Sequence, residues 1–310
     1  MNATARERLA SFSVDLDEIP CYAAIHGLPL PSGRARHAIY DEALPRYLDF
    51  FDEAGIRATF FVVGADLERP ENLARIRDAH ARGHEIASHS HTHRYDLTRR
   101  DRAFVHEEIE SSARILADAT GARPAGFRAP GYTVDEVVFE ALEASGYAYD
   151  SSVFPCPAYY VAKAAAMLAI RLRGRESRSI LDHPRVLTAP ADPYRVGARY
   201  HRRGDGMLEL PVAVTRGLRL PFIGTFVVLG SERAARSLAR GMVGRPHVCF
   251  ETHGIDLACA ERDDLAWLRP HQPDLRVSLE TKRARLLAVV EELRSHGYRF
   301  VRLDEAAARF

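Results

Sequence analysis

EIASHSHTH (residues 85–93) is the stretch around which the rest of this chain can be understood. It joins an apolar run to three histidines at alternate positions, His89, His91 and His93. In a helical turn His89 and His93 would share one face, and in an extended segment all three would point the same way. Either geometry brings imidazoles together, which is how many transition-metal sites begin. A polar loop without a ligand is the alternative, so a metal site requires partners elsewhere in the chain.

The composition is that of a globular protein. Of its residues, 46% are hydrophobic and 27% are charged. A length of 310 residues is enough for one large domain or two small ones. Lys and Arg number 43 against 42 Asp and Glu, so the net charge is close to zero. This balance gives no reason to expect a nucleic-acid partner.

Cysteine usage and the N-terminus bear on the compartment. The four cysteines form no CxxC pair and three lie in or beside apolar segments, which predicts buried thiols: Cys21, Cys156, Cys249 and Cys259. The N-terminal MNATARERLASF has no long apolar core, so no secretory signal is expected. No stretch of about 20 apolar residues suggests a membrane span. We therefore expect a cytoplasmic protein.

Strand and helix patterns alternate along the chain. Short apolar runs predict strands at 11–16, 58–64, 84–88, 126–130, 147–149, 207–212, 247–252 and 298–303. Helical spacing predicts helices at 41–54, 71–82, 101–119, 134–144, 231–242 and 279–296. Strands separated by helices are typical of parallel sheets with right-handed crossovers. We expect an α/β fold: a single domain over 1–310, a distorted (β/α) barrel with about seven parallel strands.

Residues 156–206 interrupt this alternation and are interpreted as an inserted excursion. The segment begins apolar and Ala-rich and then becomes basic, with Arg171, Arg173, Arg175 and Arg178. One interpretation is a helix packed over the mouth of the barrel. The other is that 159–178 is an interfacial helix that touches an anionic membrane, which would place the protein at its inner face.

Polar residues gather where the predicted strands end. Barrel enzymes keep their active sites at the carboxyl ends of the strands, and five of these ends carry candidates: Asp15 and Asp17, His89 and His93, Arg128, Asp150, and His253. A single Asp after a strand is often only a helix cap or a turn former. Agreement among five ends favours a metal-dependent hydrolase.

Four segments resemble, in order, the motifs of the polysaccharide deacetylases, carbohydrate esterase family 4. They are SVDLD (13–17), HSHTH (89–93), FRAP (127–130) and FETH (250–253). The resemblance implies that Asp17, His89 and His93 bind a divalent metal ion, most often zinc, and that His91 does not. It also implies that the ion activates a water molecule and polarises an amide carbonyl.

The resemblance assigns the remaining roles. Asp15 would be the general base and Arg128 its ion-pair partner. His253 would protonate the departing amine. The backbone after Pro130, at Gly131 and Tyr132, would supply an N–H for the oxyanion.

The chain departs from the family pattern in three places. Gly131 separates Pro130 from the aromatic residue that usually follows it directly. DSSVF (150–154) lacks the tryptophan of the fourth motif, so Phe154 is the expected replacement, with Asp150 as a second residue that tunes His253. The 156–206 segment replaces the glycine-rich, Tyr-bearing segments of secreted members. The FRAP and YDSSVFP segments resemble members that act in exopolysaccharide or lipid-linked sugar assembly.

These features predict removal of an N-acetyl, or alternatively N-formyl, group from an amino sugar on a polysaccharide or lipid-linked glycan. Two other hypotheses remain open at the level of sequence. The same fold hosts hydrolysis of non-sugar amides such as cyclic ureides. The second hypothesis is a catalytically silent carbohydrate-binding relative. Such a protein would need neither the base Asp15 nor the acid His253, and both are present. The oligomeric state is left open.

Overall fold

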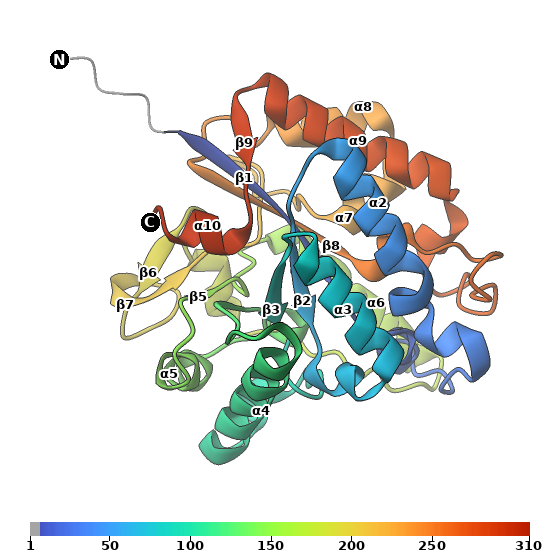
Figure 1. Ribbon diagram of the computed structural model, residues 1–310, viewed down its shortest axis with the longest axis horizontal. Coiled ribbons are helices and arrows are strands. Elements are labelled where there is room, and N and C mark those ends of the chain that lie inside the picture. The colour runs from blue at the N-terminus through green and yellow to red at the C-terminus, as the bar shows by residue number, and fades with distance from the viewer. Residues whose placement is uncertain (1–6) are drawn as a thin grey trace.

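The protein, shown as a computed structural model in Figure 1, is described over residues 7–310. The start of the N-terminal stretch discussed above, residues 1–6, lies outside this range. The strands are β1 (Arg8–Asp15), β2 (Thr59–Val62), β3 (Glu85–Ser88), β4 (Gly126–Phe127), β5 (Tyr149–Asp150), β6 (Tyr194–Val196), β7 (Arg203–Glu209), β8 (His247–His253) and β9 (Tyr298–Phe300).

Helices follow most of the strands and cover the outside of the sheet (Figure 1). They are α1 (Ile19–Ile25), α2 (Leu44–Ala54), α3 (Pro70–Ala81), α4 (Arg102–Thr120), α5 (Glu136–Ala144), α6 (Pro157–Leu172), α7 (Gly224–Leu229), α8 (Glu232–Arg240), α9 (Leu279–Ser295) and α10 (Leu303–Ala307). In the part of the chain that the structure describes, no helix is long and apolar enough to cross a bilayer.

The strands form one strongly curled sheet in the order β6-β7-β5-β4-β3-β2-β1-β8, with β9 also paired to β1. The pair β6–β7 is antiparallel and the other strand pairs are parallel. Beyond β7, the bridges Val212–Cys249 and Ile223–Glu251 join the following segment to β8. The predicted distorted (β/α) barrel is therefore confirmed.

The segment 156–206 holds α6, β6 and the start of β7. We predicted a strand at 207–212, but β7 begins earlier, at Arg203. Its first residues pair with β6 as a hairpin, so the extended backbone starts among polar and glycine residues that carry no apolar pattern. The sequence 203–206, RGDG, gave no strand signal.

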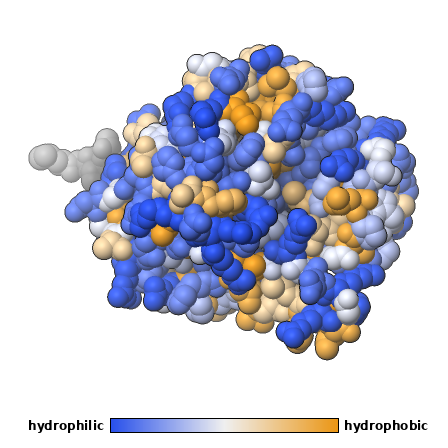
Figure 2. Space-filling view, turned by 90° about the horizontal axis from the view of Figure 1, so that it is seen from below, coloured by the Kyte–Doolittle hydropathy of each residue, from blue (hydrophilic) through white to orange (hydrophobic). Residues whose placement is uncertain are grey.

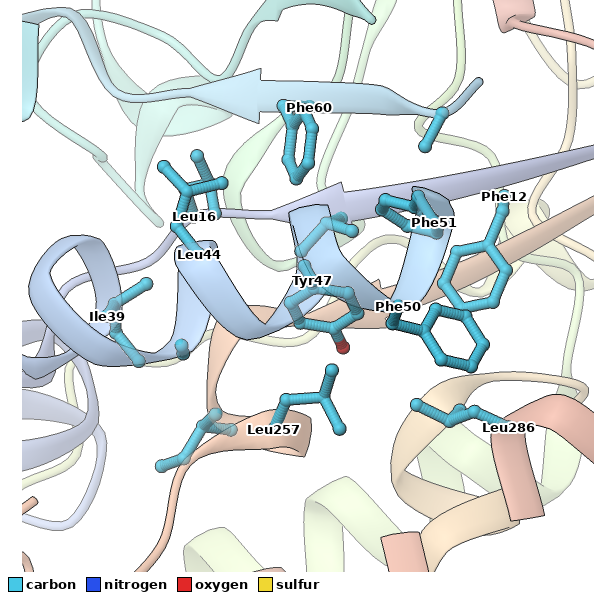
Figure 3. Packing of buried hydrophobic residues seen from close by; sticks show 14 of the residues in the cluster. Phe12, Leu16, Ile39, Leu44, Tyr47, Phe50, Phe51, Phe60, Leu257 and Leu286 are labelled. Atoms are coloured by element: carbon cyan, nitrogen blue, oxygen red, sulfur yellow. The ribbon is translucent and has the colours of Figure 1, made fainter. Parts of the chain in front are cut away.

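An aromatic cluster fills the space between the sheet and the helices α2 and α9 (Figure 3). The ring of Phe12 on β1 lies 4.9 Å from that of Phe250 on β8 and 5.0 Å from that of Phe51 on α2. Helix α2 ends at Gly55, whose φ of 59° is the left-handed conformation that glycine adopts without strain. The packing of α2 fixes β1, which ends at Asp15 and leads directly to Asp17.

The four cysteines are free thiols, as predicted. Cys156 and Cys249 are buried, whereas Cys21 and Cys259 are only partly buried, contrary to the expectation. Burial raises the pKa of the Cys249 thiol.

Figure 2 shows a face of the molecule on which hydrophilic residues predominate and apolar residues gather in patches.

Candidate metal centre and catalytic site

Two neighbouring strands direct alternate polar residues into the barrel. Side chains of a strand alternate between its faces, so on β1 Phe12 and Val14 join the core while Ser13 and Asp15 face inward. On β8 Phe250 joins the core, while the residues of the opposite face point to the barrel interior: His247, Cys249, Glu251 and His253. The parallel pairing of the strands places Asp15 beside His253.

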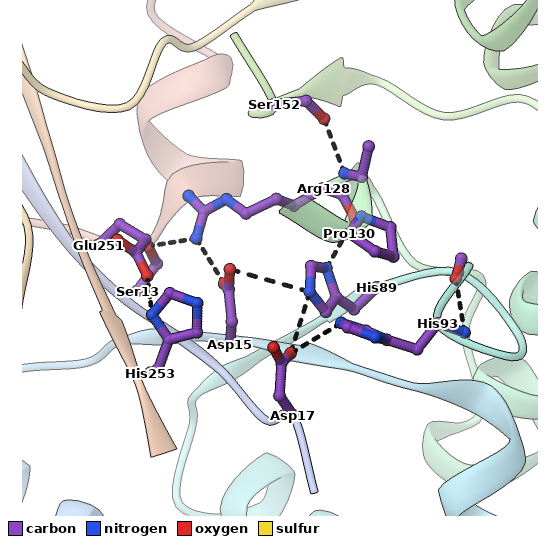
Figure 4. Close-up of polar contacts among 12 residues, drawn as sticks. Ser13, Asp15, Asp17, His89, His93, Arg128, Pro130, Ser152, Glu251 and His253 are labelled. Carbon is purple, nitrogen blue, oxygen red and sulfur yellow. Dashed lines mark hydrogen bonds and ion pairs between the residues drawn. The ribbon is translucent and has the colours of Figure 1, made fainter. Parts of the chain in front are cut away.

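Asp17, His89 and His93 come together as predicted for a metal-ligand set (Figure 4). Their ligand atoms lie within 4.8 Å of one another and all three residues are buried. Asp17 Oδ1 is 3.2 Å from His89 Nε2 and 3.1 Å from His93 Nε2.

The histidine segment reaches this geometry as a loop, and it is neither of the two expected forms, a helical turn or an extended strand. After β3 ends at Ser88, Ser90 and His93 take the positive φ values of 62° and 54°. The Ser90 Oγ accepts a hydrogen bond from the His93 N–H at 3.1 Å. These two left-handed residues turn His93 back toward His89. His91 lies outside the ligand group.

The hydrogen bonds of His89 define which nitrogen faces the site. His89 Nδ1 lies 2.7 Å from the carbonyl oxygen of Arg128, which can only accept, so Nδ1 carries the proton. The lone pair of Nε2 therefore points toward Asp17. A histidine held in this way by a backbone carbonyl is typical of metal ligands.

The buried atoms of this group fit a divalent ion. Among the described residues, Asp17 Oδ1 and both ring nitrogens of His93 have no hydrogen-bond partner. Burial opposes the charge of Asp17, but in the metal-free protein the protonated imidazoles of His93 and His89 outweigh it and hold the Asp17 pKa well below its usual range. One carboxylate and two neutral imidazoles form a donor set that zinc prefers.

Arg128 and Asp15 form the predicted ion pair in full burial. Arg128 Nη1 donates to Asp15 Oδ1 at 2.6 Å, and Asp15 Oδ2 is 3.9 Å from His89 Nε2. Burial raises the pKa of Asp15 in spite of the guanidinium beside it. The carboxylate is thus oriented by Arg128 and made more basic by its surroundings.

His253 lies beside Asp15 but is tuned by a residue that we did not predict. His253 Nδ1 is 2.8 Å from Glu251 Oε1, and Asp15, Glu251 and His253 form a second group within 4.8 Å. Burial opposes the charge on His253, but the Glu251 carboxylate raises the pKa of His253 well above its ordinary value. The sequence carried a signal for this pair, because residues i and i+2 of a strand share a face.

Asp150 does not contact His253, contrary to the role expected for it. Its carboxylate accepts hydrogen bonds from the backbone N–H and the hydroxyl of Ser152, at 3.0 and 2.7 Å. The Ser152 hydroxyl in turn accepts the N–H of Ala129 at 2.8 Å. Asp150 therefore supports the backbone next to Arg128 instead of the imidazole.

The turn after Pro130 is left-handed at both predicted oxyanion residues. Gly131 has a φ of 65° and Tyr132 one of 61°. The Tyr132 N–H is engaged with Ala129 O at 3.0 Å, whereas the Gly131 N–H has no partner within residues 7–310. Gly131 is thus the better candidate of the two for an oxyanion donor. The side chain of Tyr132 packs against Phe154, with ring centroids 5.3 Å apart.

A cleft of about 500 Å³ opens next to His93. Its lining is polar and includes the side chains of Arg94, Tyr95, Arg99 and Arg178. Asp96 also lines this cleft and pairs with Arg94, with 2.9 Å between Asp96 Oδ1 and Arg94 Nε, so the charge of Arg94 is balanced within the lining.

Comparison with known proteins relates part of the chain to a family. Residues 37–149 match the family model described as "Polysaccharide deacetylase". The chain is 28% identical over 152 residues to a peptidoglycan deacetylase of Helicobacter pylori, covering 48% of this chain and 50% of that protein. It is 36% identical over 113 residues to a chitooligosaccharide deacetylase of Bradyrhizobium, covering 36% of this chain and 50% of the relative. The chain thus spans about half the length of these curated relatives.

The fold agrees with this assignment. A solved structure from Mycobacterium smegmatis, assigned to the polysaccharide deacetylases, superposes with a TM-score of 0.61 and 18% identity, over 100% of this chain and 92% of that one. Over residues 37–149 the chain thus matches the polysaccharide deacetylase family, carbohydrate esterase family 4, and its fold is that of the solved polysaccharide deacetylase.

Proposed function

We propose that this chain hydrolyses the N-acetyl amide, or alternatively the N-formyl amide, of an amino sugar. The observation that carries the proposal is the position of Asp15, which lies against both the Asp17–His89–His93 group and the Glu251–His253 pair. A general base, a general acid and a metal-ligand set thus converge at one point. The deacetylases of amino-sugar polymers and oligomers among the relatives support this substrate class.

Asp17, His89 and His93 would hold the divalent ion, for which zinc is our choice from the donor set. When bound, the ion supplies Lewis acidity for the amide carbonyl and lowers the pKa of water.

The protein side chains would handle the protons. Asp15 accepts a proton from the attacking water, and Arg128 holds that carboxylate in place through its 2.6 Å ion pair. His253, kept protonated by Glu251, donates its proton to the nitrogen as the C–N bond breaks. The Gly131 N–H stabilises the oxyanion in between. The products are a carboxylate and the free amine of the sugar.

Replacing the base tests this mechanism. In Asp15→Asn we expect release of acetate from an N-acetylglucosamine oligomer to fall by about 10²- to 10⁴-fold, while bound zinc stays the same. The matched control is His91→Gln, which changes the same site region outside both groups and should keep its activity. Full turnover in Asp15→Asn with metal bound would contradict the assignment.

The wild-type protein separates the remaining hypotheses. Activity on cyclic ureides without activity on N-acetylated sugars would favour the amide-hydrolase alternative. Oligosaccharide binding without any turnover, in protein loaded with zinc, would favour the catalytically silent relative.

A further inference from the structure

The outer face of helix α6 is apolar along its whole length. Val161, Leu168 and Leu172 are 71%, 57% and 79% exposed. Apart from Arg171, every exposed residue of the helix is apolar: Pro157, Ala158, Val161, Ala162, Ala165, Ala166, Leu168 and Leu172. The solvent face of a helix in a globular protein normally carries charged and polar residues, so this face is built for an apolar environment.

The opposite face of α6 is attached to the candidate site. The ring of Tyr159 lies 5.6 Å from that of Tyr132 and 4.9 Å from that of Phe154. Lys163 Nζ donates to the carbonyl oxygen of Gly131 at 3.2 Å. These contacts fix which side of the helix faces away from the protein.

A cationic segment follows the apolar face directly. Within residues 7–310, no ion pair is made by Arg171, Arg173, Arg175 or Arg178. Glu176 is the only acidic residue from 157 to 181. A cavity of about 290 Å³ lies along α6 and combines basic with apolar lining, from His26, Ala166, Ala169, Ile170, Arg173, Arg175, Pro270 and His271. Guanidinium groups without a protein partner are suited to phosphate oxygens.

We propose that α6 lies in the surface of an anionic phospholipid bilayer. Its 16 residues form a helix too short to span a bilayer, but an apolar face flanked by arginines is typical of helices that lie in the interface plane. The leucines and Val161 enter the acyl boundary, and the arginines at the C-terminal end meet lipid phosphates.

This orientation places the mouth of the site at the membrane. α6 is joined to Gly131 through Lys163, and Arg178 lines the cleft next to His93. If the proposed function is correct, the substrate class becomes an amino sugar carried on a lipid. Membrane binding itself does not depend on that function.

Vesicle flotation tests the proposal on the full chain. We expect the wild-type protein to float with vesicles of phosphatidylglycerol and phosphatidylcholine, to remain in the bottom fraction with pure phosphatidylcholine, and to dissociate as salt is raised. Leu168→Glu/Leu172→Glu should reduce the bound fraction by about tenfold or more, because two carboxylates then face the acyl region. Arg173→Ala/Arg175→Ala should weaken binding to the anionic vesicles and make the remaining binding less sensitive to salt.

The control is Leu287→Glu, which changes a partly exposed leucine of α9, 38% exposed, outside the α6 face. It should float like the wild type, and unchanged melting temperatures would show that the variants fold. Failure of the wild type to float, or equal flotation of Leu168→Glu/Leu172→Glu, would overturn the proposal. A concentration-dependent dimer that the same double variant abolishes, without vesicle binding, would assign the face to a second copy of the chain.

Discussion

Arg128 is a fully buried charge, and the structure stabilises it with partners on every side. Nε donates to the carbonyl oxygen of Ser151, Nη2 donates to its hydroxyl, and Nη1 is shared between Ser13 Oγ and Asp15. The guanidinium also lies 4.0 Å from the ring centre of Phe61. A buried charge is tolerated only with this degree of satisfaction, so Arg128 fixes the position of Asp15 very closely.

Loss of one imidazole should release the metal. In His89→Ala we expect affinity for zinc to fall by more than about a hundredfold, because one of three protein ligands is gone. Metal content after dialysis, measured by mass spectrometry, checks this. His91→Gln, in the same loop, should bind zinc like the wild type, and equal loss in both variants would mean that the loop as a whole had been disturbed.

The buried carboxyl groups of Asp150 and Glu209 should make the stability of the protein depend on pH. Burial and the Asp150 carboxylate raise the pKa of Glu209 well above its ordinary value. The folded state thus holds a proton that the unfolded chain releases near pH 4.5. Above that pH the free energy of unfolding falls as pH rises, by up to about 1.4 kcal/mol per pH unit until the folded pKa is passed. The stabilisation is complete below pH 4.5.

Glu209→Gln should remove this dependence. The amide can keep the acceptor for the Val153 N–H, which lies 3.0 Å from Glu209 Oε1 in the wild type, and can donate to Asp150. We expect the variant to gain about 1–3 kcal/mol over the wild type between pH 5 and pH 8 in urea unfolding. Glu291→Gln on the exposed side of α9 is the control. Parallel curves of unfolding free energy against pH for the wild type and Glu209→Gln would mean that Glu209 does not hold the extra proton of the folded state.

At the scale of elements, the short strands β4 and β5 depend on close packing where they begin, at Gly126 and Tyr149. β4 is only two residues long, and a Cβ added at Gly126 would overlap the ring of Tyr149 on β5. That ring is held by a hydrogen bond from its hydroxyl to Glu85 Oε1 at 2.8 Å. Glu85 Oε2 also accepts from the Asp304 N–H at 3.0 Å, so β3, β5 and α10 are joined at one carboxylate.

Gly126→Ala should therefore destabilise the protein by about 3 kcal/mol, because neither strand can move without breaking this network. Urea unfolding measures the loss. Gly121→Ala is the comparison: Gly121 ends α4 with a φ of 83° and open space around it, so only backbone strain of about 1 kcal/mol is expected. Equal losses in the two variants would contradict the packing explanation.

At the scale of the whole molecule, the alternation of strands and helices was sufficient to predict the barrel, and strand ends were sufficient to bring together Asp15, Asp17, His89 and His253. The i, i+2 spacing of Glu251 and His253 on one strand was a signal for their pairing, but the expectation went to Asp150, which the structure places against Ser152 instead. The β6–β7 hairpin was missed because its residues carry no apolar alternation. The loop at Ser90 was missed because its shape depends on tertiary contacts of 64–65 with Ser90 and His91.

The pairing of β1 has a consequence for the order in which the protein can be made. β1 is translated first, yet it lies between β2 and β8 and also pairs with β9, whose residues are about 290 positions later. The order of synthesis leaves β1 without its β8 and β9 partners until those segments have been made, and contacts this distant in sequence form slowly because long loops must close first. Completion of the sheet, and with it the approach of Asp15 to His253, is therefore a late step of folding.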